Sequence, residues 1–160
     1  IHTVSYHRQK YLLEKSRFRD RMMGNTTDPD SENSQEIFER FKKESAPAIM
    51  VSPSFSTGWD FAGPLAEYQI LAKVPFPPSV SKVIQARKDR DPRYLDYLAM
   101  QNLMQAAGRI QRFMEDRGET FIVDGALTYF MNRNKYMAPK WFTDDLRRIA
   151  RLPMRPEKLK

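Results

Sequence analysis

The stretch that decides the expected fold is AIMVSPSFSTGWDFAG, residues 48–63. It opens with the short apolar run Ala48–Val51, which is typical of a strand buried in a sheet. The segment that follows, Ser52–Gly63, is rich in small hydroxyl residues and glycine. Residues of this kind at the carboxyl end of a parallel strand are where α/β sheets bind phosphates. The stretch therefore predicts an α/β domain with a loop that faces phosphate groups.

Apolar runs and amphipathic stretches alternate on both sides of this loop, which is the order of a mainly parallel sheet. We expect further strands at Ile1–Ser5, Arg21–Met23, Tyr68–Val74 and Thr120–Val123. We expect helices at Tyr6–Phe18, Gln35–Glu44, Ala126–Arg133 and Thr143–Arg151, a loop at Thr26–Ser34 and a turn at Asp116–Gly118. A basic stretch, Lys82–Arg93, leads into a longer helix from Asp91-Pro92 to about Phe113, because aspartate caps helices and proline suits their first turn. Residues 1–152 are expected to form one domain and residues 153–160 a frayed tail.

The composition is that of a soluble globular domain, with 41% hydrophobic and 29% charged residues, and it excludes a disordered or fibrous chain. The excess of 27 Lys and Arg over 20 Asp and Glu gives a net charge of +7, which favours an anionic partner. The chain has no cysteine, which excludes disulfides, thiolate metal sites and cysteine nucleophiles. His2 and His7 are too few for a metal cage and are expected to be ordinary surface or edge residues.

The segment QAAGRIQR, residues 105–112, carries the most specific pattern of charged residues. On a helix, Gln105, Arg109 and Arg112 would fall within about 60° of one another, away from the apolar stripe. Gly108 beside them would allow a backbone or a phosphate to approach closely. Two guanidinium groups aimed one way suit a polyphosphate, because arginine offers a planar fork of donors. The alternative is a solvated face of an amphipathic helix.

The spacing Q-x-x-G-R-x-x-R resembles motif VI of superfamily 2 helicases. The loop resembles motif V of their XPD/DinG branch, S-F-x-E-G-x-D-F-x-G, with Thr57 where the branch has glutamate; the matching residues are Ser54, Phe55, Gly58, Asp60, Phe61 and Gly63. Val74–Pro78 is similar to the L-P-F-P-P run of the branch, and Ile1–Tyr6 is similar to motif IV, F-x-x-S-Y. These blocks stand in the family's order between Ile1 and Asp124.

The resemblance implies a RecA-like (P-loop NTPase-type) domain, which is a three-layer α/β/α arrangement around a mainly parallel sheet. It implies that Arg109 and Arg112 are catalytic and that four residues bind nucleotide: Gln105, Gly108, Gly58 and Asp60. It implies DNA contacts from Ser5, Tyr6, Ser54 and Ser56, and no metal site in this segment.

The resemblance also implies partners and cofactors. ATP and Mg²⁺ would be held mainly by a first RecA-like domain, expected to precede Ile1, because this sequence has no G-x-x-x-x-G-K-[ST] loop and no D-E-x-[DH] block. The 160 residues alone are then expected to be inactive. The partners are that first domain and single-stranded DNA, in a monomer of the cytoplasm, or of the nucleus in a eukaryote. No membrane partner is expected, because no apolar run approaches the roughly 20 residues that a membrane span needs.

Other interpretations of the same residues stay open. One is a non-catalytic nucleic-acid-binding module with a degenerate nucleotide site. It gains some support from Thr57 and from the pair Asp124-Gly125, where the branch has arginine close behind aspartate. A plain docking domain is a third possibility. Locally, Ser5 would serve as a helix cap. The loop would be a surface loop in which Asp60 caps a local turn and Trp59 and Phe61 pack in the core.

Overall fold

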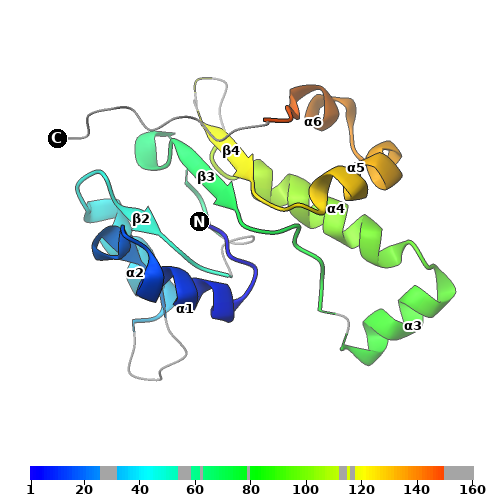
Figure 1. The fold of residues 1–160 in the computed structure, drawn as a ribbon, viewed down its shortest axis with the longest axis horizontal. Coiled ribbons are helices and arrows are strands. Elements are labelled where there is room, and N and C mark those ends of the chain that lie inside the picture. Colours follow the sequence, from blue (N-terminus) through cyan, green and yellow to red (C-terminus); the bar gives the residue numbers. More distant parts are fainter. Residues whose placement is uncertain are drawn as a thin grey trace.

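The computed structural model describes residues 1–25, 32–53, 59–61, 63–78, 80–111, 115 and 118–149. Helices and short parallel strands alternate along this part of the chain, which confirms the predicted α/β class (Figure 1). The helices are α1 (Tyr6–Lys15), α2 (Ser34–Lys43), α3 (Lys82–Arg90), α4 (Tyr94–Ala107), α5 (Leu127–Asn134) and α6 (Lys140–Asp145). The strands are β1 (Met22–Met23), β2 (Ile49–Met50), β3 (Tyr68–Leu71) and β4 (Glu119–Ile122), and short 3₁₀ turns lie at Arg19–Arg21, Gly63–Leu65 and Lys135–Met137.

The described strands pair in parallel, and a single residue joins the two pairs into one sheet. β1 pairs with β2, and β3 pairs with β4 from Tyr68–Glu119 to Leu71–Ile122. Between the two ladders, His2 forms parallel bridges to Ser52 on one side and to Leu71 on the other. The order across the sheet is therefore β1, β2, the segment around His2, β3 and β4.

The strand expected at Ile1–Ser5 is thus reduced to one bridging residue. Thr3 N still donates to Ser52 O at 3.0 Å, so the chain is extended up to that point. Val4 then adopts a φ of 63°, a left-handed conformation that is rare for a β-branched residue. The chain leaves the sheet there and enters α1 at once.

Helices cover both faces of the sheet, as the predicted three layers require. Met23 and Gly24 follow one another in extended chain, so they face opposite sides. Met23 belongs to a buried cluster with Ile37 and Phe38 of α2. On the other side, a Cβ built on Gly24 would meet the Gln9 side chain of α1 at 2.6 Å. α1 and α2 therefore lie on opposite faces.

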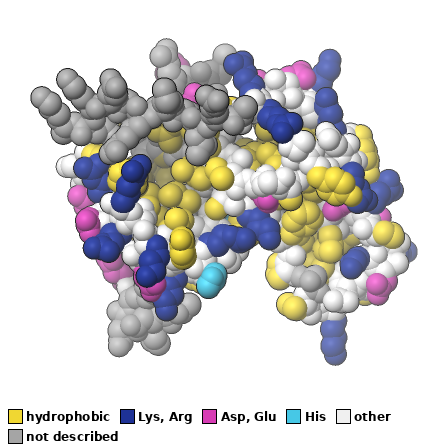
Figure 2. Space-filling view, viewed as in Figure 1, with side chains coloured by type: hydrophobic (Ala, Val, Ile, Leu, Met, Phe, Trp, Pro, Cys, Tyr) yellow, Lys and Arg dark blue, Asp and Glu magenta, His cyan; other side chains and the backbone are white. Residues whose placement is uncertain are grey.

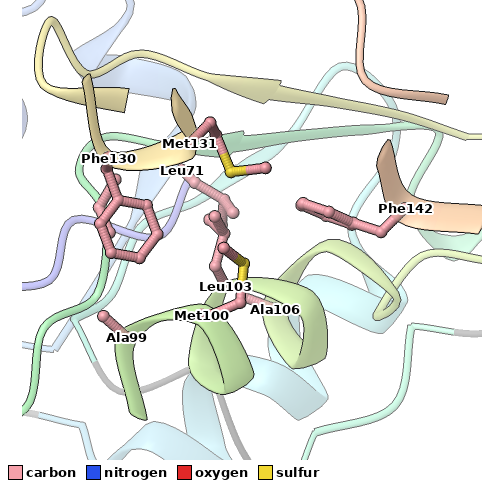
Figure 3. Close-up of a cluster of buried hydrophobic side chains, with 9 residues drawn as sticks. Leu71, Ala99, Met100, Leu103, Ala106, Phe130, Met131 and Phe142 are labelled. Carbon is pink, nitrogen blue, oxygen red and sulfur yellow. The ribbon is translucent and has the colours of Figure 1, made fainter. Parts of the chain in front are cut away.

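The larger core cluster lies between β3 and the three helices α4, α5 and α6 (Figure 3). Leu71 of β3 is fully buried, and Ile122 of β4 packs against the cluster. The helices contribute Ala99, Met100, Leu103, Ala106, Phe130, Met131 and Phe142. This core fixes α4 along one face of the sheet, and so fixes the part of the chain that follows α4.

Several element boundaries differ from the expected ones for local reasons. α1 ends at Lys15, three residues before Phe18, where Ser16 N closes the last turn on Leu12 O at 3.0 Å. α4 begins at Tyr94 because Asp91 Oδ1 accepts from Arg93 N at 2.9 Å and holds residues 91–93 in a turn.

Two further differences concern whole elements. The basic stretch forms a separate helix, α3, with no buried residue, so it lacks the apolar stripe by which a helix is predicted. The last helix was expected at Thr143–Arg151, but α6 occupies Lys140–Asp145, where Pro139 sets its start and Phe142 is buried. Residues 146–149 are not helical. Within the described residues, no helix has the length and the apolar character that crossing a bilayer requires.

Candidate functional site

The candidate residues at the start of the chain lie at the carboxyl edge of the sheet. The Ser5 hydroxyl accepts from Arg8 N at 3.4 Å, so Ser5 caps α1, as one of the two interpretations predicted. Thr3 Oγ1 donates to Ser5 O at 3.1 Å and fixes the turn from the other side. Tyr6 is 46% exposed at the first position of the helix. Both residues therefore lie where α/β sheets bind their ligands.

His2 holds the loop that follows β2 and is not the surface or edge residue that was expected. Its side chain is 5% exposed at the centre of the sheet. The ring Nε2 lies 2.8 Å from Pro53 O, and because a carbonyl only accepts, Nε2 is the donor. Nδ1 is buried and has no hydrogen-bond partner among the described residues. The contact places Pro53, and with it the start of the serine-rich loop, next to the segment that ends in Ser5. Ser54 and Ser56 lie outside the described residues. His7 is exposed, as expected.

Burial lowers the pKa of His2, because the charged imidazolium loses its hydration there. The folded state therefore keeps His2 neutral where the unfolded chain, with a histidine pKa of about 6.5, already takes up a proton. Above a pH of about 6.5, His2 is neutral in both states and does not affect the free energy of unfolding. Below that pH, the free energy of unfolding falls because of His2 by at most about 1.4 kcal/mol per pH unit.

We expect the difference in free energy of unfolding between pH 7.5 and pH 5.5 to shrink when His2 is replaced by glutamine. The glutamine amide keeps a donor for Pro53 O but does not titrate. The measurement is urea unfolding at both pH values, with His7→Gln as a control that removes an exposed histidine. Equal pH dependence in the wild type and in His2→Gln would show that His2 titrates alike in the folded and unfolded chain.

The second group of candidate residues lies at the opposite, amino edge of the sheet. Gln69 Nε2, near the start of β3, donates to Ala106 O at 2.9 Å. Thr120 Oγ1, near the start of β4, donates to Ala107 O at 3.3 Å. The end of α4 is thereby held at the amino ends of both strands. Gly108, directly after it, caps the helix with its N–H donated to Met104 O at 3.1 Å.

This early end of α4 corrects the predicted geometry of the arginines. The helix was expected to reach Phe113, so that Gln105, Arg109 and Arg112 would share one face. It ends at Ala107, where the side chains of Gln69 in β3 and Thr120 in β4 donate to its last carbonyls. Gln105 is exposed on the last turn of α4, whereas Arg109 follows the helix. Arg112 lies outside the described residues.

Arg109 joins the two motifs that the sequence singled out. Its Nη1 donates to Trp59 O at 3.0 Å, across 50 positions of the chain. Ile110, the next residue, is buried in the same cluster as Phe61. The structure therefore brings Arg109 together with the second half of the loop, whose Asp60 is exposed. Gly58 lies outside the described residues.

The two aromatic residues of the loop pack inward, as the local alternative predicted. The Phe38 ring of α2 meets Trp59 at a centroid distance of 5.0 Å and Phe61 at 5.3 Å, both edge to face. Asp60 lies between these two packed residues, so its backbone is held in place while its side chain is exposed. The packing and the candidate role of Asp60 are compatible.

Asp124 is a connecting residue that the sequence reasoning did not assign. Its Oδ2 accepts from Val74 N and its Oδ1 from Ala126 N, both at 2.9 Å. The side chain thus ties the segment after β3 to the turn after β4. A signal was present, because Asp124 follows a strand and precedes Gly125, but spacing alone does not reveal its partner. In the described part of the chain, no three His, Asp or Glu side chains gather as metal ligands.

Comparison with known proteins adds one finding to this geometry. The family model described as a helicase C-terminal domain matches residues 1–145, from the segment that pairs through His2 to the end of α6. A comparison with curated proteins finds no match.

Proposed function

This chain belongs to the helicase C-terminal domain family, and we propose that it is the second RecA-like motor domain of an ATP-dependent DNA helicase. In this proposal a first motor domain supplies the phosphate loop and the Mg²⁺ ligands, and ATP lies between the two domains. The chain supplies arginine to the nucleotide and part of the track for single-stranded DNA. The single observation that carries the proposal is the family match across residues 1–145.

The proposed nucleotide side is the amino edge of the sheet, where α4 ends. The residues proposed to bind nucleotide are Gln105, Gly108, Arg109 and Arg112 of motif VI and Gly58 and Asp60 of the loop. The contact between Arg109 and Trp59 O supports it, because the two motifs meet there. Arginine stabilises the negative charge that develops on a transferred phosphoryl group. Asp60 would accept a hydrogen bond from a ribose hydroxyl.

The proposed DNA side is the carboxyl edge. Ser5 and Tyr6 from the start of α1, and Ser54 and Ser56 from the loop after β2, would bind one strand through its phosphates and by stacking. The His2–Pro53 contact supports this grouping, since it holds the start of the loop against the segment before Ser5. Nucleotide binding would close the cleft between the domains and hydrolysis would open it, so that grip on the strand alternates.

We expect the purified chain to bind single-stranded DNA weakly, without strong sequence preference and with steep salt dependence. Each phosphate contact releases a counterion, so the logarithm of the affinity should fall linearly with the logarithm of the salt concentration. Fluorescence anisotropy with labelled oligonucleotides, from about 50 to 200 mM salt, measures this. Tight and salt-insensitive binding to one duplex sequence would contradict it.

The alternative, a non-catalytic nucleic-acid-binding module, predicts the same binding and is separated by ATPase activity. The chain alone should hydrolyse ATP at background level under the motor proposal. The full-length protein should hydrolyse ATP in a DNA-stimulated manner, which a passive module would not do. Robust Mg²⁺-dependent turnover by the 160 residues alone would contradict the assignment of the site to two domains.

A further inference from the structure

A cluster of arginine and tyrosine side chains covers the end of the molecule formed by α3, the start of α4, α5 and the 3₁₀ turn after α5. We call it the Arg–Tyr surface; its contacting residues are Arg87, Arg93, Tyr94, Tyr129, Arg133 and Tyr136. The exposed residues Lys88, Arg90 and Lys135 lie close to them along the chain. Figure 2 shows Lys and Arg side chains beside hydrophobic ones over this end. None of these residues belongs to the motifs on which the proposed function rests.

The cationic and aromatic side chains of this surface are in direct contact. Arg87 Nη1 donates to the Tyr94 hydroxyl at 2.6 Å, and its guanidinium lies over the same ring. Arg93 Nη1 reaches the Tyr136 hydroxyl at 3.5 Å and so links α4 to the turn after α5. These contacts join α3, the start of α4 and the turn after α5.

The aromatic rings of this surface remain open to solvent. Arg133 lies over Tyr129 with its guanidinium carbon 5.6 Å from the ring centroid, and its Nη1 donates to the hydroxyl at 3.1 Å. Tyr129 and Tyr136 are nevertheless each 66% exposed. A flat ring that is held in place and still exposed is suited to stacking on a base.

The positive charge of the surface is largely uncompensated. Segments 80–97 and 129–137 hold seven Lys or Arg residues against three Asp residues, in a chain whose net charge is +7. Within the described residues, Arg93 forms an ion pair with Asp91 at 3.8 Å, while Arg87, Lys88, Arg90 and Lys135 form none. The surface therefore favours a polyanion that also presents flat, apolar faces.

The Arg–Tyr surface lies at the carboxyl edge of the sheet, as the proposed DNA contacts do. The last turn of α4 is held at the amino ends of β3 and β4, and Asn102 Nδ2 donates to Pro75 O beyond the carboxyl end of β3 at 3.1 Å. Tyr94, two turns before Asn102, lies further out in the same direction. Figure 2 shows a hollow between this end and the part of the molecule that carries α1.

We propose that the Arg–Tyr surface is a second contact for single-stranded DNA, which holds nucleotides beyond those bound near Ser5 and Ser54. Arginine and lysine would bind phosphates, and Tyr129 and Tyr136 would stack on bases, without sequence preference. The inference rests on the proposed function, which gives the reason to expect single-stranded DNA, and it deepens that function by adding a second surface that binds the strand.

The test compares two probe lengths on the purified full-length protein. Fluorescein-labelled oligothymidylates of about 10 and about 30 nucleotides are titrated by anisotropy, since the shorter strand covers about one binding element and the longer strand covers both. We expect Tyr129→Ala with Tyr136→Ala to weaken binding of the longer strand about tenfold or more, and to leave the shorter strand unchanged. The corresponding phenylalanine variants should stay within about twofold of the wild type, because they keep the stacking face.

Matched controls come from the rest of the chain. Tyr68→Ala removes a tyrosine of similar exposure, 68%, at the amino edge. Lys88→Glu and Lys43→Glu each reverse one exposed charge in the last turn of a helix, α3 and α2 respectively, and only Lys88→Glu should lower the affinity for the longer strand.

Failure of this inference is distinguishable from failure of the proposed function. If the tyrosine variants bind the longer strand as tightly as the wild type, while DNA still stimulates the ATPase, the surface does not bind DNA and the motor assignment stands. If the wild type shows neither DNA binding nor stimulated ATPase, both are overturned.

Discussion

Replacing Arg112 or Arg109 by alanine in the full-length protein is expected to lower the kcat of DNA-stimulated ATP hydrolysis by roughly 10³–10⁵. An arginine that meets the charge of the transferred phosphoryl group acts in the transition state more than in the ground state. Nucleotide binding and DNA binding should therefore survive the substitution. Lysine should not restore turnover, because a point charge does not reproduce the planar fork of donors.

The structure adds a second expectation for Arg109. Arg109 also holds Trp59 O, so Arg109→Ala should cost about 1 kcal/mol of folding stability in addition to its effect on turnover. Steady-state ATPase rates at saturating single-stranded DNA, titration with a fluorescent nucleotide and a thermal melt separate these effects. Arg147→Ala and Arg148→Ala, on exposed positions after α6, are controls that should leave all three unchanged. Near-wild-type turnover in both Arg109→Ala and Arg112→Ala would mean that the motif VI assignment is wrong.

Gly24→Ala is expected to lower the free energy of unfolding by about 3 kcal/mol, through overpacking and the loss of a buried hydrogen bond. A Cβ at Gly24 would lie 2.6 Å from both Gln9 Nε2 and Val51 O. The carbonyl belongs to the chain just after β2 and cannot turn away, and Gln9 is buried and donates to that same oxygen at 2.9 Å. The methyl group therefore separates α1 from the sheet.

Gly125→Ala is the control for Gly24→Ala, because a Cβ at Gly125 has no atom within 4 Å. It should change stability by less than about 1 kcal/mol. Urea unfolding of the purified chain measures both, and the melting temperature of Gly24→Ala should fall by roughly 6–12 °C. Equal stability of the two variants would show that α1 can shift without loss.

The strands and their order of appearance were predictable because each is a short apolar run next to turn residues. The ends of an element were not predictable where a contact with a residue far away in the sequence decides them. Apolar spacing continues past Gly108 to Ile110, so the pattern extends the helix. Ile110 is indeed buried, but in the cluster of Phe38 and Phe61 rather than in that of α4. Periodicity detects burial and does not tell which core receives the side chain.

The sequence indicated which segments contribute to the candidate site, but it did not indicate how these segments lie relative to one another. Ser5 and Asp60 stand where strand ends and loops expose polar groups. His2 gave no signal, because a lone polar residue in an apolar run is ordinarily at a surface. Its central position follows from contacts with Ser52 and Leu71, which are far away in the sequence. α3 escaped prediction for the opposite reason, since it buries nothing.

The loop between Pro53 and Trp59 is fastened at both ends, by His2 on one side of the sheet and by Arg109 on the other. Six peptide units separate these anchors, a chain that spans at most about 20 Å when fully drawn out. Pro53 and Trp59 therefore cannot move further apart than this, so a larger displacement of His2 from Arg109 would break one of the two contacts. In the proposed motor, the contacts made by His2 and Arg109 would link the DNA side to the nucleotide side through one short piece of chain. Glycines inserted between the two anchors should weaken that link, so that ATP hydrolysis would continue with less movement along the strand.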